Sequence, residues 1–286
     1  MKFALLPNLT RKNAKEVTLK VCDFFKENNV EYCFEESLRG EFADSKRYLP
    51  ENELLDFADI IIAIGGDGSI IHAAKKACKY SKAVLGINAG NLAFMAGVEN
   101  NEIELLKELI NGNYKTDKRM LLDVKIYDRS EKLLFAEDCC VNDIVIARGQ
   151  MIKMIRLNVS CDGDRINEYY ADGIIISTPT GTTAYSLSSG GPVVDPKIKS
   201  IVLTPICTHS LFSRSIIFDS DSQLCVKIPD EEKEEICISC DGDESIIIPS
   251  GSKIVIEKSK TYADFIRIKN DSFIDVLNSK LAQRRV

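Results

Sequence analysis

The stretch "IIAIGGDGSIIHAAKK", residues 61–76, decides the fold of the first part of the chain. Residues 60–64 form an apolar run typical of a parallel strand buried on both faces. The turn "GGDG", residues 65–68, follows at once and leads into a segment with helical spacing. A glycine-rich turn at a helix N-terminus can bind anions, because free backbone N–H groups point outward there. Asp67 nevertheless places a carboxylate in this turn.

The turn matches none of three common nucleotide-binding patterns. The lysine-containing Walker A loop is absent, the six-position dinucleotide fingerprint is absent, and no catalytic-loop set of a protein kinase is present. On the residues alone, either the backbone must approach a ligand closely here, or the chain makes a simple tight bend that only glycine allows.

Strands and helices alternate along the first 115 residues or so. Short apolar runs predict strands over 3–6, 30–34, 59–64 and 83–87. Helical spacing begins near Thr10, an expected N-cap, and recurs after Gly68 and over 103–110. This alternation predicts a doubly wound α/β sheet.

The chain changes character near residue 119. Short strand-like runs separated by turn signals follow, among them "MLLDVKIYD", "VNDIVIA" and "GIIIST". Such spacing predicts an all-β domain, a sandwich or a barrel, and we favour a sandwich-like one. We therefore expect an α/β domain with the GGDG loop over 1–118 and a β-rich domain over 119–264. We expect the tail, 265–286, to return to the first domain, and its stretch "SFIDVLNSKLAQRR", 272–285, reads as a short terminal helix.

Composition narrows the function classes. The chain has 286 residues, 45% hydrophobic and 28% charged, with a formal net charge of -6. This balance excludes a general nucleic-acid binder, although a local cluster of donors can still bind a small anion. The chain has no uninterrupted apolar run of 18 residues, and the apolar run before Pro7 is too short for a signal peptide. We expect a cytoplasmic protein with no membrane partner.

The ten cysteines predict reduced thiols, packed mostly as small hydrophobic side chains. Cys237 and Cys240 form one CxxC pair. A zinc site needs a second such pair or a nearby histidine pair, and the chain has only His72 and His209, far apart in sequence. A structural role is the expectation for this pair.

A second informative stretch is "ADGIIISTPTGTTAYSLSSGGP", residues 171–192. Seven serine or threonine residues lie between 177 and 188, with Tyr185 among them. Hydroxyl groups and backbone N–H groups at a helix start suit ribose, amide or phosphate. The alternative is a disordered Ser/Thr loop, which the bracketing apolar strand and Gly-Gly-Pro disfavour.

Three smaller features are also candidates. The segment "GINAGNLAFMAG", 86–97, follows a buried strand, at the place where parallel sheets bind ligands. Asn142-Asp143 is a polar pair that could form an edge turn or grip a diol. The sequence "SCDGD" occurs at 160–164 and again at 239–243, and Asp-Gly suits a hairpin turn.

Three motifs together resemble the NAD kinase family over nearly the whole chain. They are "GGDGS" at 65–69, Asn142-Asp143, and "DGIIISTPTGTTAYSLSSGGP" at 172–192. Similar GGDG loops occur in lipid kinases and phosphofructokinases, so the first motif alone is weak. The third is specific to NAD kinases.

The resemblance implies an N-terminal α/β domain and a C-terminal β-rich domain, with NAD bound between them. It implies transfer of the γ-phosphoryl of ATP to the 2′-hydroxyl of the adenosine ribose of NAD, which forms NADP. A divalent cation, Mg²⁺ or Mn²⁺, is the implied cofactor, bound mainly through phosphates. Some bacterial members also accept polyphosphate, and members are usually homodimers or homotetramers.

The resemblance also assigns roles residue by residue. Asp67 falls on the catalytic aspartate, and Gly65, Gly66 and Gly68 form the phosphate-donor loop. The implied NAD contacts are Gly68, His72, Phe94, Asn142, Asp143, Lys153, Tyr170, Asp172, Thr183, Ala184, Tyr185, Ser186, Leu187, Ser188, Cys207 and Asp243.

The chain departs from the family pattern at four of its positions. Ala93 stands in place of the glycine of an "LGF" motif, and Asp143 stands where many members have Glu. Tyr170 stands where many have Arg or Lys, and Asp243 where Gln is frequent. Lys153 is a basic residue that could supply charge nearby, as in relatives. The second "SCDGD" is therefore expected to be more than a hairpin turn.

These assignments give a mechanistic hypothesis. A ribose hydroxyl is a poor nucleophile, so a carboxylate that accepts its hydrogen bond aligns it and takes its proton late. We assign this role to Asp67, although contact with the metal instead stays open. A lipid or sugar kinase is the nearest rival, and an NAD(P)-binding regulator without catalysis is another. Neither explains both the hydroxyl-rich motif and Asp67.

Overall fold

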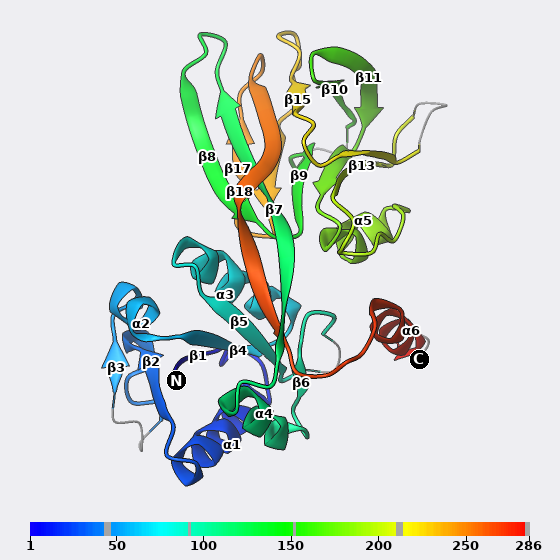
Figure 1. Ribbon diagram of the computed structural model, residues 1–286. Helices are drawn as coiled ribbons and strands as arrows, with labels where there is room; N and C mark the ends of the chain where they lie inside the picture. Colours follow the sequence, from blue (N-terminus) through cyan, green and yellow to red (C-terminus); the bar gives the residue numbers. More distant parts are fainter. Residues whose placement is uncertain (43–46, 91–92, 151–152, 210–213, 284–286) are drawn as a thin grey trace. The chain divides into compact units, whose positions relative to one another are not determined.

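A computed structural model describes residues 1–286 except 43–46, 91–92, 151–152, 210–213 and 284–286. The chain divides into two compact units (Figure 1). Unit 1 comprises Met1–Lys118 with Ala263–Val286, and unit 2 comprises Arg119–Tyr262. Strands β7 (Lys115–Tyr127) and β18 (Lys253–Arg267) each run from one unit into the other. The predicted fold class, an α/β domain followed by an all-β domain, is confirmed.

Unit 1 is built on a parallel sheet. Its strands are β1 (Lys2–Pro7), β2 (Glu31–Glu35), β3 (Tyr48–Leu49), β4 (Ile60–Gly65), β5 (Ala83–Asn88) and β6 (Val98–Glu99). Their order is β5-β4-β1-β2-β3, with β6 and the end of β18 both paired to β5. Every residue of β4 is buried, as expected for a strand covered on both faces.

Helices cover both faces of this sheet. The helices of unit 1 are α1 (Ala14–Glu27), η1 (Glu36–Leu38), α2 (Glu51–Phe57), α3 (Asp67–Lys79), η2 (Ile103–Leu105), α4 (Leu106–Ile110) and α6 (Phe273–Gln283), of which α6 does not pack on the sheet. Figure 1 shows α3 on one side of the sheet and α1 and α4 on the other. The side chains of α1 and α4 pack with alternate strand residues such as Ile60, Ile62 and Ile64.

One local prediction in unit 1 was wrong, and another was right in extent but not in helix type. Thr10 is no N-cap: α1 begins at Ala14, and the Thr10 N–H and hydroxyl both donate to Asn8 Oδ1, at 3.1 and 2.6 Å. Because this side chain–backbone turn engages Thr10, the helix starts four residues later. The helix predicted over 103–110 is divided into η2 and α4.

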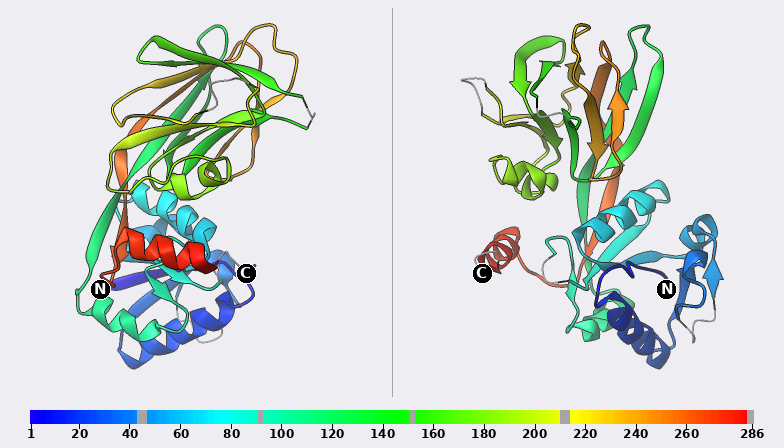
Figure 2. Two further views of the ribbon diagram at one scale, coloured as in Figure 1. Left: turned by 90° about the vertical axis from the view of Figure 1, so that its right-hand side faces the viewer. Right: turned by 180° about the vertical axis from the view of Figure 1, so that it is seen from behind.

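The C-terminal segment belongs to unit 1, and Figure 2 shows where its helix α6 lies. Lys280 Nζ lies 2.9 Å from Glu99 Oε1, at the end of β6. Lys269 Nζ lies 2.6 Å from Glu102 Oε2 in the same part of the unit. Two ion pairs therefore attach the segment after β18 to the β6–η2 region.

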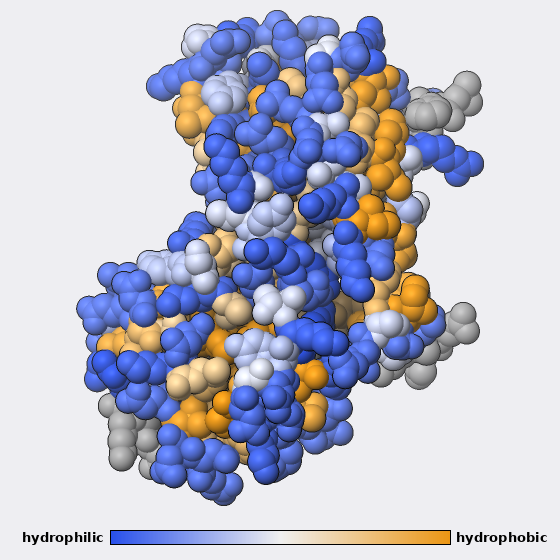
Figure 3. Space-filling model, in the orientation of Figure 1, coloured by the Kyte–Doolittle hydropathy of each residue, from blue (hydrophilic) through white to orange (hydrophobic). Residues whose placement is uncertain are grey.

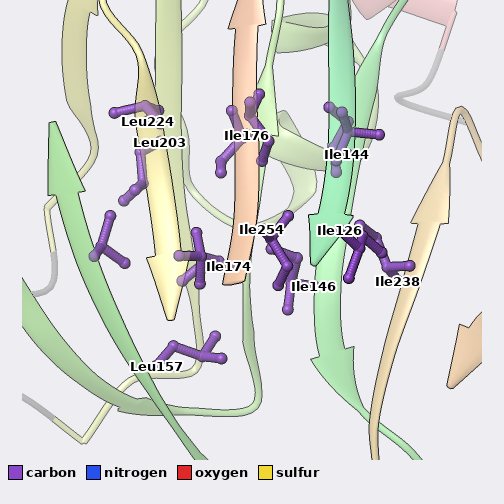
Figure 4. Packing of buried hydrophobic residues seen from close by; sticks show 14 of the residues in the cluster. Ile126, Ile144, Ile146, Leu157, Ile174, Ile176, Leu203, Leu224, Ile238 and Ile254 are labelled. Carbon is purple, nitrogen blue, oxygen red and sulfur yellow. The ribbon is translucent and has the colours of Figure 1, made fainter. Parts of the chain in front are cut away.

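Unit 2 is a sandwich of two antiparallel sheets. One sheet has the order β14 (Ile216–Asp219), β13 (Ser200–Ile206), β12 (Gly173–Ser177), β9 (Asp143–Arg148), β16 (Ile236–Cys240) and β17 (Ile246–Ile248). The other contains β7 and β18 with β8 (Leu133–Cys140), β10 (Ile155–Cys161), β11 (Asp164–Ala171) and β15 (Leu224–Lys227). Figure 4 shows Ile144, Ile174 and Leu203 of the first sheet among the buried side chains that pack with Leu157, Leu224 and Ile254 of the second.

Hydrophilic residues are frequent on the surface, as expected for a chain in which 28% of the residues are charged. Figure 3 shows a largely hydrophilic face with apolar residues gathered in patches. None of the ten cysteines forms a disulfide, and six of them are buried. Cys237 and Cys240 both lie in β16, and residues three apart in a strand point to opposite faces. Among the described residues, no helix is long and apolar enough to cross a membrane.

Candidate active site

The GGDG turn joins β4 to α3 in unit 1. Gly65 ends the strand and Asp67 begins the helix, with the extended Gly66 as N-cap. A Cβ on Gly65 would lie 2.7 Å from Ser69 Cβ, so this position requires glycine. Among the described residues beyond the immediate chain neighbours, no atom lies within 4 Å of a Cβ built on Gly66 or Gly68. The turn therefore leaves open space at two of its glycines, next to the backbone N–H groups of a helix start.

The Asp67 carboxylate is held by the neighbouring loop. Its Oδ2 accepts the Phe94 N–H at 3.0 Å, and its Oδ1 accepts the Met95 N–H at 2.9 Å. The loops after β4 and β5 are adjacent because these strands pair in parallel. Part of the candidate loop 86–97, Asn91 and Leu92, lies outside the described residues. The structure thus brings Asp67 and Phe94 together at the N-terminus of α3, and His72 is exposed farther along this helix.

In unit 2, Asp143 begins β9 and Asn142 directly precedes it; β9 lies in the interior of the six-stranded sheet, between β12 and β16. The pair is therefore not an edge turn. The Asp241 carboxylate, from the turn after β16, accepts the backbone N–H groups of Val141, Asn142 and Asp143 at 2.8, 2.6 and 3.1 Å. The Asp143 side chain is buried. Burial, followed by the nearby Asp241 carboxylate, raises the pKa of Asp143 from 3.8 to about 7.

This raised pKa predicts a dependence of stability on pH. Asp143 takes up a proton on folding between about pH 4 and pH 7, so its contribution to the free energy of unfolding falls as the pH rises through this window. The slope of this contribution approaches about 1.4 kcal/mol per pH unit. We expect Asp143→Asn to remove this pH dependence, so that the variant becomes more stable relative to wild type as the pH rises. Urea denaturation at pH 5 and pH 7.5 measures this difference, and parallel profiles for the two proteins would contradict it.

The hydroxyl-rich stretch is ordered, so the alternative of a disordered loop is wrong. It forms η3 (Gly181–Thr183) and α5 (Tyr185–Ser188) after β12. Several hydroxyls serve the protein itself: Thr182 Oγ1 donates to Pro179 O at 2.7 Å, and Ser186 Oγ lies 3.0 Å from Thr204 Oγ1. Tyr185 and Ser188 are exposed instead. These two side chains are the members of the stretch best placed to meet a ligand.

Three further candidates of unit 2, Tyr170, Asp172 and Cys207, lie at the other end of β12, whereas Asp243 lies in the turn after β16, near Asp143. Arg148 Nε donates to Asp172 Oδ1 at 2.8 Å, and the Arg156 guanidinium lies 5.9 Å from the Tyr170 ring centre. The Asp172 N–H donates to Ile206 O, which places the exposed Cys207 nearby. Lys153, expected to supply positive charge, pairs with Glu234 at 3.0 Å.

The strand register separates these residues from the Asn142-Asp143 pair. Gly173 is paired with Ala147 at one end of β12, and Ser177 is paired with Asp143 at the other. A strand of this length spans about 13–16 Å. The structure therefore brings together Tyr170, Asp172 and Cys207, but it does not bring them next to Asn142 and Asp143.

Comparison with known proteins decides the family. The models of the ATP-NAD kinase N-terminal domain and the ATP-NAD kinase C-terminal domain match residues 3–114 and 141–268. An NAD kinase of Thermoanaerobacter sp. (strain X514) is 35% identical over 284 residues, which covers 99% of each chain. The chain belongs to the NAD kinase family. The predicted family is confirmed, and NAD kinase activity follows from this membership.

Two solved structures of NAD and NADH kinases share the fold. A yeast NADH kinase complexed with NADH has a TM-score of 0.88 at 22% identity, covering 100% of this chain and 89% of that one. An NAD kinase from Archaeoglobus fulgidus in complex with ATP has a TM-score of 0.74 at 23% identity, covering 99% of both. At these identities the likeness bears on the fold alone.

Within this NAD kinase family member, the two "SCDGD" copies behave differently. Both place Asp-Gly in left-handed backbone conformations, with φ of 52° and 92° at Asp162-Gly163 and 55° and 78° at Asp241-Gly242. The first copy is the hairpin turn between β10 and β11, as predicted. In the second copy, Asp241 accepts the backbone N–H groups of residues 141–143, a contact that the sequence analysis did not predict, and the NAD contact expected of Asp243 stays a prediction. The second occurrence of "SCDGD" is the feature of the sequence that could have pointed to Asp241.

No cluster of metal-ligating side chains in the described structure accompanies the predicted divalent cation. Among the residues that the structure describes, no group of three or more His, Cys, Asp or Glu side chains could hold a metal ion. The sequence likewise assigns no protein ligand to the divalent cation, which the family resemblance places mainly on phosphates.

Proposed function

We propose that this NAD kinase transfers the γ-phosphoryl of ATP to the 2′-hydroxyl of the adenosine ribose of NAD, which forms NADP. The observation that carries the proposal is the Asp67 carboxylate, fixed at the start of α3 by two backbone N–H groups and flanked by the open positions of Gly66 and Gly68. A carboxylate held in this way is ready to orient a hydroxyl group without first having to be ordered.

The roles divide between the two units. Asp67 accepts the hydrogen bond of the 2′-hydroxyl and takes its proton, and the glycine backbone of the turn meets the donor's phosphates. Asn142 and Asp143 bind a ribose or base edge, and Tyr185 and Ser188 are the exposed contacts of the hydroxyl-rich stretch. Asp172 with Tyr170 forms a second group of polar contacts.

A divalent cation, Mg²⁺ or Mn²⁺, belongs to the proposal as a cofactor. It would be held mainly by the phosphate oxygens of the donor, which suits a cation with a preference for oxygen ligands, and would neutralise their charge. Polyphosphate is a second donor to be tested in place of ATP.

The purified chain with NAD, ATP and Mg²⁺, followed by an NADP-specific dehydrogenase, tests this function. NADP should accumulate with time and with enzyme concentration. Absence of NADP would contradict the proposal. NAD binding without turnover would favour a regulator, and phosphorylation of a lipid or sugar instead of NAD would favour the rival kinase classes.

We further propose a cytoplasmic homodimer or homotetramer. Ile217 in β14 and Ile247 in β17 are 53% and 62% exposed, and these strands are the two edges of the six-stranded sheet. Exposed apolar edge strands favour pairing with another chain. Light scattering of the purified protein measures the mass, and a monomer at micromolar concentration would contradict this.

A further inference from the structure

The backbone of residues 141–143 is held by one side chain from a distant turn. Asp241 Oδ1 accepts the N–H groups of Asn142 and Asp143, and Oδ2 accepts that of Val141. The Asp241 N–H in turn donates to Asp143 O at 2.9 Å. Hydrogen bonds to a charged acceptor are about twice as strong as neutral ones, so this is a strong clamp.

A second clamp closes on the carbonyl side of the same segment. The Thr178 N–H donates to Asn142 O at 2.8 Å, and Thr178 Oγ1 donates to Val141 O at 2.7 Å. With Asp241, these bonds satisfy every backbone N–H and C=O of Val141 and Asn142. The segment is therefore fixed from both sides by loops of unit 2.

The position of the Asp241 carboxylate costs free energy, because it places a second carboxylate near that of Asp143. It lies close enough to the buried Asp143 to be one cause of that residue's raised pKa. Asp162, in the same turn of the first "SCDGD" copy, has a similar φ, but its carboxylate accepts only one backbone N–H of the described residues, that of Gln223 at 2.8 Å. The same turn therefore forms in the first copy without its Asp carboxylate contacting another candidate residue.

We propose that Asp241 is a positioning residue, which holds the backbone of residues 141–143 so that the Asn142 and Asp143 side chains meet NAD. The inference rests on the proposed function, because it takes Asn142 and Asp143 as contacts of that substrate. Asp241 itself acts through this backbone and has no part in the chemical step.

The test uses two matched pairs of variants in the full chain. Asp241→Gly removes the acceptor while tolerating the positive φ, and Asp241→Asn keeps one acceptor oxygen and also tolerates that conformation. Asp162→Gly and Asp162→Asn make the same changes in the first copy. For each protein, kcat, KM for NAD and KM for ATP are measured with the coupled NADP assay, together with NAD binding in the absence of ATP.

We expect Asp241→Gly to raise KM for NAD about tenfold or more, as for the loss of hydrogen bonds to a charged group, with KM for ATP nearly unchanged. For Asp241→Asn, KM for NAD should lie between the values for Asp241→Gly and for wild type. Both Asp162 variants should have the wild-type KM for NAD. A merely structural role would lower the amount of active enzyme and leave KM unchanged.

Three results would overturn the inference while leaving the function intact. They are an unchanged KM for NAD, equal rises in KM for NAD and ATP, and an equal effect of the Asp162 variants. If Asp241→Gly does not fold, Asp241→Asn decides by the same criteria. A wild-type chain that forms no NADP would instead overturn the proposed function, so the two failures are distinguishable.

Discussion

Replacing Asp67 by Asn is expected to lower kcat by about 100-fold or more, because the amide cannot accept the proton of the 2′-hydroxyl. The substitution keeps the size of the side chain and one acceptor oxygen. Since the carboxylate accepts the N–H groups of both Phe94 and Met95, one of these two loses its acceptor in the variant. The loss of a proton acceptor and the displacement of the loop must therefore be separated.

Kinetic constants from the coupled NADP assay separate them. Loss of the proton acceptor lowers kcat with KM for NAD and ATP nearly unchanged, whereas a displaced loop raises KM as well. Asp59→Asn is the matched control, because Asp59 is an exposed residue of the same unit whose carboxylate also accepts a backbone N–H, that of Lys2 at 2.8 Å. This control should retain wild-type kcat. A near-normal kcat for Asp67→Asn would contradict the assignment of Asp67.

The turn that contains Asp67 could be predicted from the sequence because its structure is local. A wholly apolar run, two glycines and a helical pattern stand in consecutive positions, and β4 and α3 appear where they predict. The segment after β2 shows the opposite case. Helix α2 has seven residues and buries only Leu54 and Leu55, so its apolar pattern is too short to identify a helix without the sheet that it covers.

The sequence predicts which residue types belong to the candidate site, but it does not predict how they are arranged in space. Asn142 and Asp143 stand out as polar residues in a β-rich run, yet the carboxylate that holds them comes from Asp241, about a hundred positions later. That contact depends on β16 pairing with β9, which a single sequence does not specify. The same holds for Asp172, since only the register of β9 and β12 separates it from Asp143.

The close approach of Gly181 to Asn142 leads to the other large expected effect. A Cβ on Gly181 would lie 2.7 Å from Asn142 Cα and closer still to its carbonyl group. Asn142 cannot move aside easily, because Asp241 and Thr178 hold its backbone. Gly181→Ala therefore overpacks a buried backbone contact, and we expect it to lower the free energy of unfolding by roughly 3 kcal/mol.

Thermal unfolding of the full chain measures this loss, and a fall in Tm of roughly 6 °C or more is the expected result. Gly68→Ala is the matched control, because Gly68 lies in the first turn of α3 and a Cβ there would meet no atom of the described residues within 4 Å outside its own stretch of helix, so its Tm should not fall below that of wild type. If Gly181→Ala also kept the wild-type Tm, the segment at Asn142 would be able to yield to an added methyl group. The double clamp by Asp241 and Thr178 would then be too weak to position Asn142 and Asp143.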